Sequence, residues 1–326
     1  MSEPRTRRWR PDWPCRPGHQ VGGLRRGAGD PTHRVVDGVH WRGVATPDGV
    51  ATLAVPATVD ATGHVEVRAW GSGADWLLDR VPALLGDLDD PTGFEPRHPV
   101  LVEAVRRHGV PRFGRTGLVV EALVPAVLEQ KVTGQEAFAG HRALVRRHGS
   151  RAPGPGDQLD LWVAPPAEVV AAVPSWEWLQ LHVDPARSRA LVGAAARGRA
   201  VERIGSLLPA GSGIDPAGGR EAERRLTSLP GIGEWTAAEV RRRALGDPDA
   251  VSFGDYHVAK NVGWALTGEP FDDDQLREYL EPWAGHRARV VALLGAAGLS
   301  RPRRGPRMAP RTHLPARTPG TRYPRA

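Results

Sequence analysis

The residues best suited to chemistry lie in two short stretches of the second half of the chain. Leu229 to Ala237 reads LPGIGEWTA, which predicts a tight glycine turn between two helices. The helix that follows Gly233 begins with backbone N–H groups at the positive end of its dipole, and such a helix start suits a phosphate. Asp255 follows 22 residues after Gly233, in the stretch SFGDYHVAK. The sequence therefore predicts an anion anchor and a carboxylate that are one helix and a short loop apart.

Each stretch also has an ordinary structural explanation. The glycines of such a turn can serve only to let two helices approach closely, and an Asp before a helix is most often an N-cap. Asp247 and Asp249 belong to a GDPD turn and are weaker candidates for a catalytic acid. The combination of the glycine turn with the spacing to Asp255 favours a catalytic carboxylate that its capping geometry holds rigidly.

The elements that must position these residues are mostly helices. Apolar residues recur at helical spacing over residues 91–299, which predicts a helical body with the helix-turn-helix at 221–245. Residues 33–90 instead alternate with period two between turns at 47–49 and 60–63, which predicts a three-stranded antiparallel meander followed by helix. The expected fold is mainly α with a small N-terminal antiparallel β/α domain, α+β overall.

The two ends of the chain are basic and lack a regular pattern. Residues 300–326 hold eight Arg and no acid, and residues 1–29 hold seven Arg against two acids. Because the whole chain carries +7, the remaining body has a net charge of −6, so the basicity of the chain does not by itself indicate a nucleic-acid surface on the body. We predict a disordered basic arm at 1–32 and a disordered Arg- and Pro-rich tail at 300–326.

Cysteine content and hydropathy exclude several classes of protein. Cys15 is the only cysteine, which excludes an internal disulfide framework and a four-cysteine iron–sulfur cluster. We place Cys15 in the flexible arm. No stretch is apolar enough for a membrane span, and the N-terminus lacks the apolar core of a signal peptide. We expect a cytoplasmic protein without a membrane partner.

LPGIGEWTA followed by SFGDYHVAK resembles the helix-hairpin-helix DNA glycosylase superfamily, and within it the DNA-3-methyladenine glycosylase II family. The similarity includes a Gln-x-Val-Thr step at Gln130 to Thr133 and spans roughly Val81 to Leu299. It implies a monofunctional DNA glycosylase of base-excision repair, which hydrolyses the N-glycosidic bond of alkylated purines of the 3-methyladenine type. The implied partner is double-stranded DNA that contains a damaged base, bound by a nucleoid-associated monomer that requires no cofactor.

The resemblance also implies roles for individual residues. Asp255 occupies the place of the family's catalytic carboxylate. Trp235 stands where bifunctional relatives carry the lysine that forms a Schiff base. The other implied roles are a base pocket of Trp235, Glu239 and Tyr256, DNA contacts from Gly231, Ile232, Gly233, Thr236, Gln130 and Lys131, and a monovalent cation at the backbone carbonyls of Thr227, Leu229 and Ile232.

Three positions depart from the family's pattern. Lys131 stands where the familiar wedge is apolar, Glu239 where the better-known relatives have a pocket tyrosine, and Gly295 where they have a cleft tryptophan. Glu239 either contacts a cationic purine or is a surface residue that pairs with Arg243 one turn later. Two other functions stay open: a non-catalytic helix-hairpin-helix DNA-binding protein, and a glycosylase for another damaged base.

Overall fold

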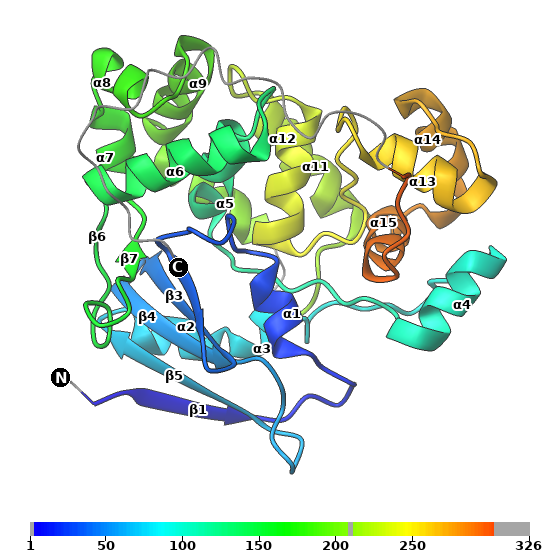
Figure 1. The fold of residues 1–326 in the computed structure, drawn as a ribbon, viewed down its shortest axis with the longest axis horizontal. Helices are drawn as coiled ribbons and strands as arrows, with labels where there is room; N and C mark the ends of the chain where they lie inside the picture. The colour runs from blue at the N-terminus through cyan, green and yellow to red at the C-terminus, as the bar shows by residue number, and fades with distance from the viewer. Residues whose placement is uncertain (1–2, 208–210, 303–326) are drawn as a thin grey trace.

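The computed structural model describes residues 3–207 and 211–302, which form an antiparallel sheet beside a larger helical body (Figure 1). The five-stranded sheet has the order β1-β5-β4-β3-β2. The expected α+β class, with helices predominating, is confirmed. The strands of this sheet are β1 (Arg5–Trp9), β2 (His33–Val36), β3 (Val39–Thr46), β4 (Gly49–Pro56) and β5 (Val65–Gly71).

The N-terminal segment corrects one prediction, because residues 3–32 belong to the sheet domain. β1 pairs antiparallel with β5 and forms one edge of the sheet. α1 (Pro17–Gly22) follows, and Val21 and Cys15 are buried in the core beneath the sheet. The prediction of a disordered arm at 1–32 is therefore wrong for residues 3–32. The partner of this Arg-rich strand lies some 60 residues away in β5, and no local pattern reveals such a pairing.

The predicted meander has one more strand than expected, because its first strand is split. Asp37 and Gly38 adopt φ angles of 49° and 72° and make the tight turn between β2 and β3. Two successive residues with positive φ match the twist of an antiparallel hairpin. The Pro/Gly loop expected at 150–160 also differs, because its ends pair as the short strands β6 (Ser150–Arg151) and β7 (Trp162–Val163).

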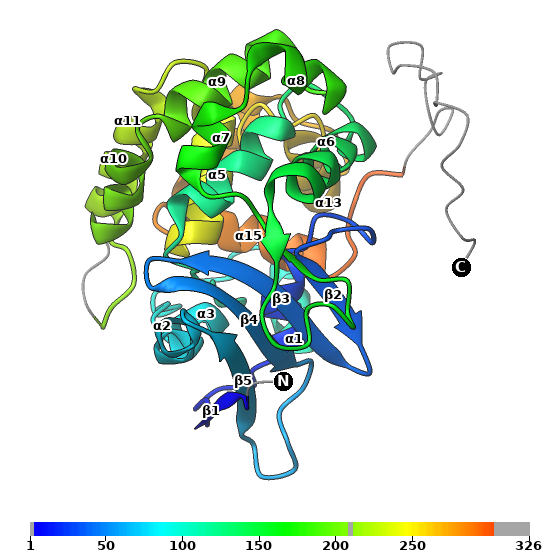
Figure 2. The same cartoon turned by 90° about the vertical axis from the view of Figure 1, so that its left-hand side faces the viewer.

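One face of the sheet is covered by α1, α2 (Ala74–Asp79) and α3 (Val81–Leu85) (Figures 1 and 2). α1 packs on β3 and β4, α2 packs on β4 and β5, and α3 packs against the other two helices. Alternate strand residues such as Val65, Val67 and Ala69 are fully buried in this core. The period-two pattern therefore marks the buried face in β5, whereas β4 is buried on both faces from Ala51 to Val55.

The middle of the helical body is built around α5 (Val119–Leu128), in which every residue except Glu121 is buried. α6 (Gly134–His148), α9 (Pro185–Ala195) and α12 (Glu234–Val240) pack directly against α5, and together they form the largest apolar core. The other elements of this part are α7 (Ala167–Ala172), α8 (Ser175–Gln180), α10 (Gly198–Glu202), the 3-10 helix η1 (Arg203–Leu207) and α11 (Pro216–Thr227).

A separate helical core joins α4 to the last helices of the chain. The chain enters this core at α4, leaves it for the α5 core, and returns after α12. The returning segment, 246–257, carries Asp255, so the candidate carboxylate lies where the two helical cores meet. The members of the second core are α4 (Pro99–His108), α13 (Val258–Thr267), α14 (Asp273–Leu280), the 3-10 helix η3 (Glu281–Trp283) and α15 (Arg287–Ala296).

The tail predicted at 300–326 lies outside the described residues from 303 onward. Within the described ranges, every helix is too short or too polar to cross a membrane.

Candidate active site

The glycine turn joins α11 to α12, and the structure explains a glycine differently at each of its two positions. Gly231 has a φ of +83°, and a Cβ there would come within 2.7 Å of the Ala190 Cβ. Gly233 has an ordinary φ of −97°, and a Cβ there would meet nothing within 4 Å. Ile232, between them, is buried in the α5 core and anchors the turn. The packing of Ile232 in the α5 core thus fixes the turn, and the space beside Gly233 at the start of α12 is open.

The helix after the turn ends at Leu245 as predicted, but its last five residues are not α-helical. α12 ends at Val240 and continues as the π-helical turn η2 (Arg241–Leu245), which stops at Gly246 with a φ of +67°. The helix preceding the turn begins at Pro216, five residues before the predicted start at Glu221.

Asp255 is held by three donors. Its Oδ1 accepts the backbone N–H groups of His257 at 2.7 Å and Val258 at 3.1 Å, which is the predicted capping geometry at the start of α13. Its Oδ2 accepts the Trp235 indole N–H at 3.3 Å. Asp255 is half-buried, so the carboxylate is fixed and still reachable from solvent. Trp235, which follows the glycine turn in α12, therefore connects the α5 core to Asp255 at the entry of the second helical core.

Gln130 joins the end of α5 to the turn. Its side-chain amide donates to the Gly231 carbonyl at 3.0 Å and to the Thr236 hydroxyl at 2.8 Å. Lys131 follows with a φ of 54°, an uncommon conformation for a residue other than Gly, and its side chain is exposed. Two predicted DNA-contact residues are thus brought beside the turn. The carbonyls predicted to bind a cation border the same turn, and that of Leu229 also accepts the Ile232 N–H at 3.0 Å.

Glu239 is buried rather than on the surface, and its carboxylate is fully engaged. It forms an ion pair with Arg243, accepts two bonds from Arg242 at 3.1 Å, and accepts the Ser252 hydroxyl at 2.5 Å. Burial alone would raise the pKa of Glu239, but the two guanidinium groups outweigh it and hold the pKa below its usual value. The predicted pairing with Arg243 is present, and no oxygen of Glu239 is left for a cationic base without breaking this network.

Sequence reasoning missed the residues around this network. Arg26, from the segment taken for a disordered arm, is buried and lies 3.4 Å from Glu129 at the end of α5. Burial, with Arg243 nearby, lowers the pKa of Arg26 to about 10, so it remains charged. Ser252, three residues before Asp255, could have been suspected from its position, whereas nothing in the sequence points to Arg26.

Tyr256 lies on the surface with 73% of its area exposed. It packs edge-on against His257, and the Lys260 ammonium lies 3.7 Å from its ring centroid. The predicted pocket residues therefore differ in setting: Trp235 touches the carboxylate, Glu239 lies in a buried ion cluster, and Tyr256 is at the rim.

A cavity of about 720 Å³ lies elsewhere, between β3, α5, α6 and α10. Arg42 and His141 line it, whereas Asp255 and Trp235 do not. The candidate site is thus the boundary between the two helical cores and not this cavity. In the described part of the chain, no three His, Cys, Asp or Glu side chains are grouped as metal ligands.

No protein-family model matches the sequence, and no curated protein matches it. Solved structures do match. A 3-methyladenine DNA glycosylase from Archaeoglobus fulgidus has a TM-score of 0.72 at 19% identity, over 90% of this chain and 99% of that one. An 8-oxoguanine glycosylase/lyase from Clostridium acetobutylicum has a TM-score of 0.62 at 14% identity, over 85% and 91%. The same enzyme in complex with double-stranded DNA has a TM-score of 0.59 at 14% identity, over 86% and 91%. The chain therefore has the fold of the helix-hairpin-helix DNA glycosylases.

Proposed function

We propose that this protein is a monofunctional DNA glycosylase of base-excision repair that hydrolyses the N-glycosidic bond of alkylated purines. The observation that carries the proposal is the position of Asp255, a rigidly held carboxylate that Trp235 links to an open glycine turn. The fold supports it, because the solved structures of this fold reported above are named as DNA glycosylases. We place its activity on double-stranded DNA that contains a damaged base.

In the proposed reaction the bond between C1′ and the base breaks, and a bond forms between C1′ and a water oxygen. The electron pair leaves with the base. The transition state has oxocarbenium character, so the Asp255 carboxylate stabilises positive charge that develops on the sugar. It also orients the attacking water, whose proton passes to the carboxylate or to solvent. A purine alkylated at N3 or N7 is cationic and leaves as a neutral base, so no strong general acid is needed.

Trp235 supports both the alkylated substrate and the monofunctional mechanism. An electron-rich indole attracts a cationic base over a neutral one by cation–π interaction, worth about 1–2 kcal/mol when desolvated. An indole also cannot form the Schiff base that a lysine at this position would form. Because the Glu239 carboxylate is already bound by its own partners, the preference for a cationic base comes from Trp235 and from Tyr256 at the rim.

DNA binding is proposed at the glycine turn and at the end of α5. The start of α12 has no side-chain cap, and the open space at Gly233 lets a phosphate approach its N–H groups. Lys131 is proposed to fill the gap left by the everted nucleotide, because it is exposed and Gln130 fixes its loop to the turn. A monovalent cation at the carbonyls of Thr227, Leu229 and Ile232 remains a proposal.

The test of the function is base release from alkylated duplex DNA by the purified protein. We expect release of free 3-methyladenine or 7-methylguanine. We expect no covalent protein–DNA adduct when borohydride is present, because no Schiff base forms. Release of 8-oxoguanine with borohydride trapping would instead support the alternative of a glycosylase for another damaged base. DNA binding without release of any base would support a non-catalytic binding protein.

Two alanine substitutions separate the roles of the glycines in the turn. Gly231→Ala should destabilise the protein, because the residue has positive φ and its Cβ would press on Ala190. Gly233→Ala should leave the denaturation midpoint unchanged and weaken binding to every DNA sequence about tenfold, or ~1.4 kcal/mol, because its methyl group blocks the phosphate. Fluorescence anisotropy with several duplexes measures the second effect. A loss restricted to certain sequences would contradict phosphate anchoring.

A further inference from the structure

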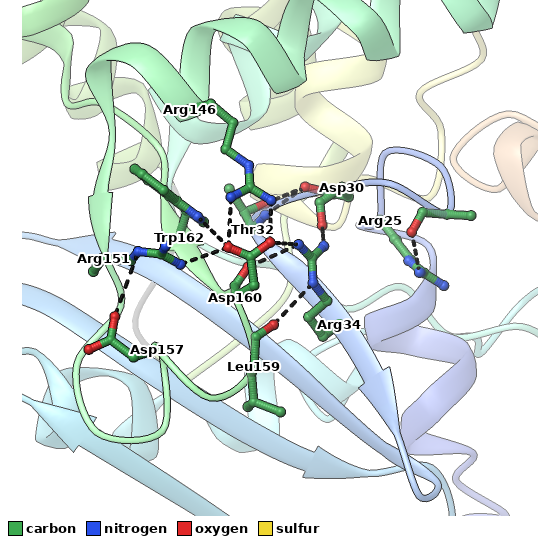
Figure 3. A network of polar contacts seen from close by, with 11 residues as sticks. Arg25, Asp30, Thr32, Arg34, Arg146, Arg151, Asp157, Leu159, Asp160 and Trp162 are labelled. Atoms are coloured by element: carbon green, nitrogen blue, oxygen red, sulfur yellow. Dashed lines mark hydrogen bonds and ion pairs between the residues drawn. The ribbon is translucent and has the colours of Figure 1, made fainter. Parts of the chain in front are cut away.

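Five arginines gather around the second half of α6, where the segment before β2 and the ribbon β6–β7 pack against it. Figure 3 shows four of them: Arg34, Arg146 and Arg151 point toward the single carboxylate of Asp160. Arg25 lies to one side and donates to the Ala28 carbonyl at 2.8 Å. We call this group the α6 basic surface; its members are Arg25, Arg34, Arg142, Arg146 and Arg151.

The acids of this surface do not neutralise it. Asp160 accepts hydrogen bonds from Arg34 at 3.3 Å, Arg146 at 2.6 Å and Arg151 at 2.7 Å, so three guanidinium groups share one carboxylate (Figure 3). Asp157, 3.6 Å from Arg151, is a second acid. Five positive charges against these two leave a surplus of three, which the buried Asp30 behind them reduces to two.

The guanidinium groups are fixed in place and remain accessible. Those of Arg146 and Arg151 lie 5.1 Å and 4.4 Å from the centroid of the Trp162 ring, close enough for cation–π attraction. Their side chains are nevertheless 41% and 47% exposed. Cations that are already ordered lose little conformational entropy when they bind a phosphate.

Arg142 is the member with the fewest partners. Its side chain lies along Gly29, where an added Cβ would meet the Arg142 Cδ at 3.2 Å. Within the described residues its guanidinium has no acidic partner. This arginine can therefore bind an anion without breaking an existing ion pair.

The surface extends away from the candidate site. α6 begins at Gly134, three residues after Lys131. At a rise of about 1.5 Å per residue, Arg142 and Arg146 lie about 12 and 18 Å along the helix. B-DNA advances about 3.4 Å per base pair, so these side chains match phosphates about four to five base pairs beyond Lys131.

We propose that the α6 basic surface binds the phosphate backbone of duplex DNA on one side of the lesion, the side toward which α6 runs from Lys131. The orientation of the DNA rests on the proposed function. Once the folded N-terminal segment is included, residues 3–299 carry a net charge of −1, so a local positive surplus is what attracts a long flanking duplex to this surface. The contact is with phosphates only and is independent of sequence.

The experiment measures the salt dependence of binding to a duplex with an abasic-site analogue. One duplex has about 15 base pairs on both sides of the analogue, and two others keep only about 3 on one side or the other. Arg142→Gln and the double variant Arg142→Gln, Arg151→Gln are compared with the wild type. The control is Arg106→Gln on α4, which Figure 1 shows at the opposite end of the molecule.

On the full duplex, the slope of log affinity against log salt should fall by about 0.9 for Arg142→Gln and by about 1.8 for the double variant. The decrease in slope relative to the wild type should vanish on the duplex that lacks the flank bound by the α6 basic surface and persist on the other truncated duplex. Arg106→Gln should have the slope of the wild type on all three duplexes. An unchanged slope for Arg142→Gln on the full duplex would overturn the proposal. Arg142→Gln breaks no ion pair, so misfolding does not obscure this result, and because no base release is measured, it is independent of whether the protein is a glycosylase.

Discussion

Asp255→Asn should abolish base release while leaving binding to abasic-site DNA nearly intact. An asparagine is isosteric, and its side-chain oxygen can still accept the N–H groups of His257 and Val258, so the cap at the start of α13 survives. The charge that stabilises the oxocarbenium ion is lost, and release should fall by on the order of 10³-fold. Single-turnover release from an alkylated duplex measures the effect.

Binding to an abasic-site duplex is the control for Asp255→Asn, because it depends on the glycine turn and not on the charge of Asp255. The variant should also keep the denaturation midpoint of the wild type. If base release and abasic-site binding fell by the same factor, Asp255 would be a structural cap and not a catalytic group.

The largest effect on stability is expected for Asp89→Asn. Arg289 is 0% exposed, and its two guanidinium Nη atoms bind the Asp89 carboxylate at 2.6 and 2.5 Å. Removing the negative charge leaves a buried cation uncompensated, which costs about 3–5 kcal/mol of unfolding free energy. The pair also joins α15 to the segment that leads into α4, so the second helical core should loosen as a unit. Urea denaturation measures the loss.

Asp75→Asn provides the matched control for that measurement. Asp75 also pairs with an arginine, Arg5, at 2.6 Å, but its side chain is 69% exposed. Solvent screens such a pair, and its loss should cost less than about 1 kcal/mol. Similar losses in both variants would show that burial does not set the strength of the Arg289 pair.

The sequence predicted the local features of the site well, because they depend on neighbouring residues. The glycine turn, the cap at Asp255 and the pairing of Glu239 with Arg243 all follow from spacings of a few residues. The helical body also follows, because its apolar period is regular.

Contacts between distant segments could not be predicted. β1 finds its partner in β5, and Arg26 reaches Glu129 more than a hundred residues later. Arg289 likewise finds its partner, Asp89, 200 residues away. Composition was misleading at the N-terminus: an Arg-rich stretch without periodicity resembles a disordered arm, and only the edge of a sheet formed elsewhere gives it structure.

The order in which the chain visits its two helical cores has a consequence for biosynthesis. α4 leaves the ribosome about 150 residues before α13, and its apolar residues Leu101 and Ala104 have no partners until the C-terminal helices follow. At about 5–20 residues per second, this wait lasts roughly 8–30 s. The nascent chain therefore completes the glycine turn before Asp255 is locked in place, and the proposed function predicts that a chain truncated before Asp255 binds DNA without releasing a base.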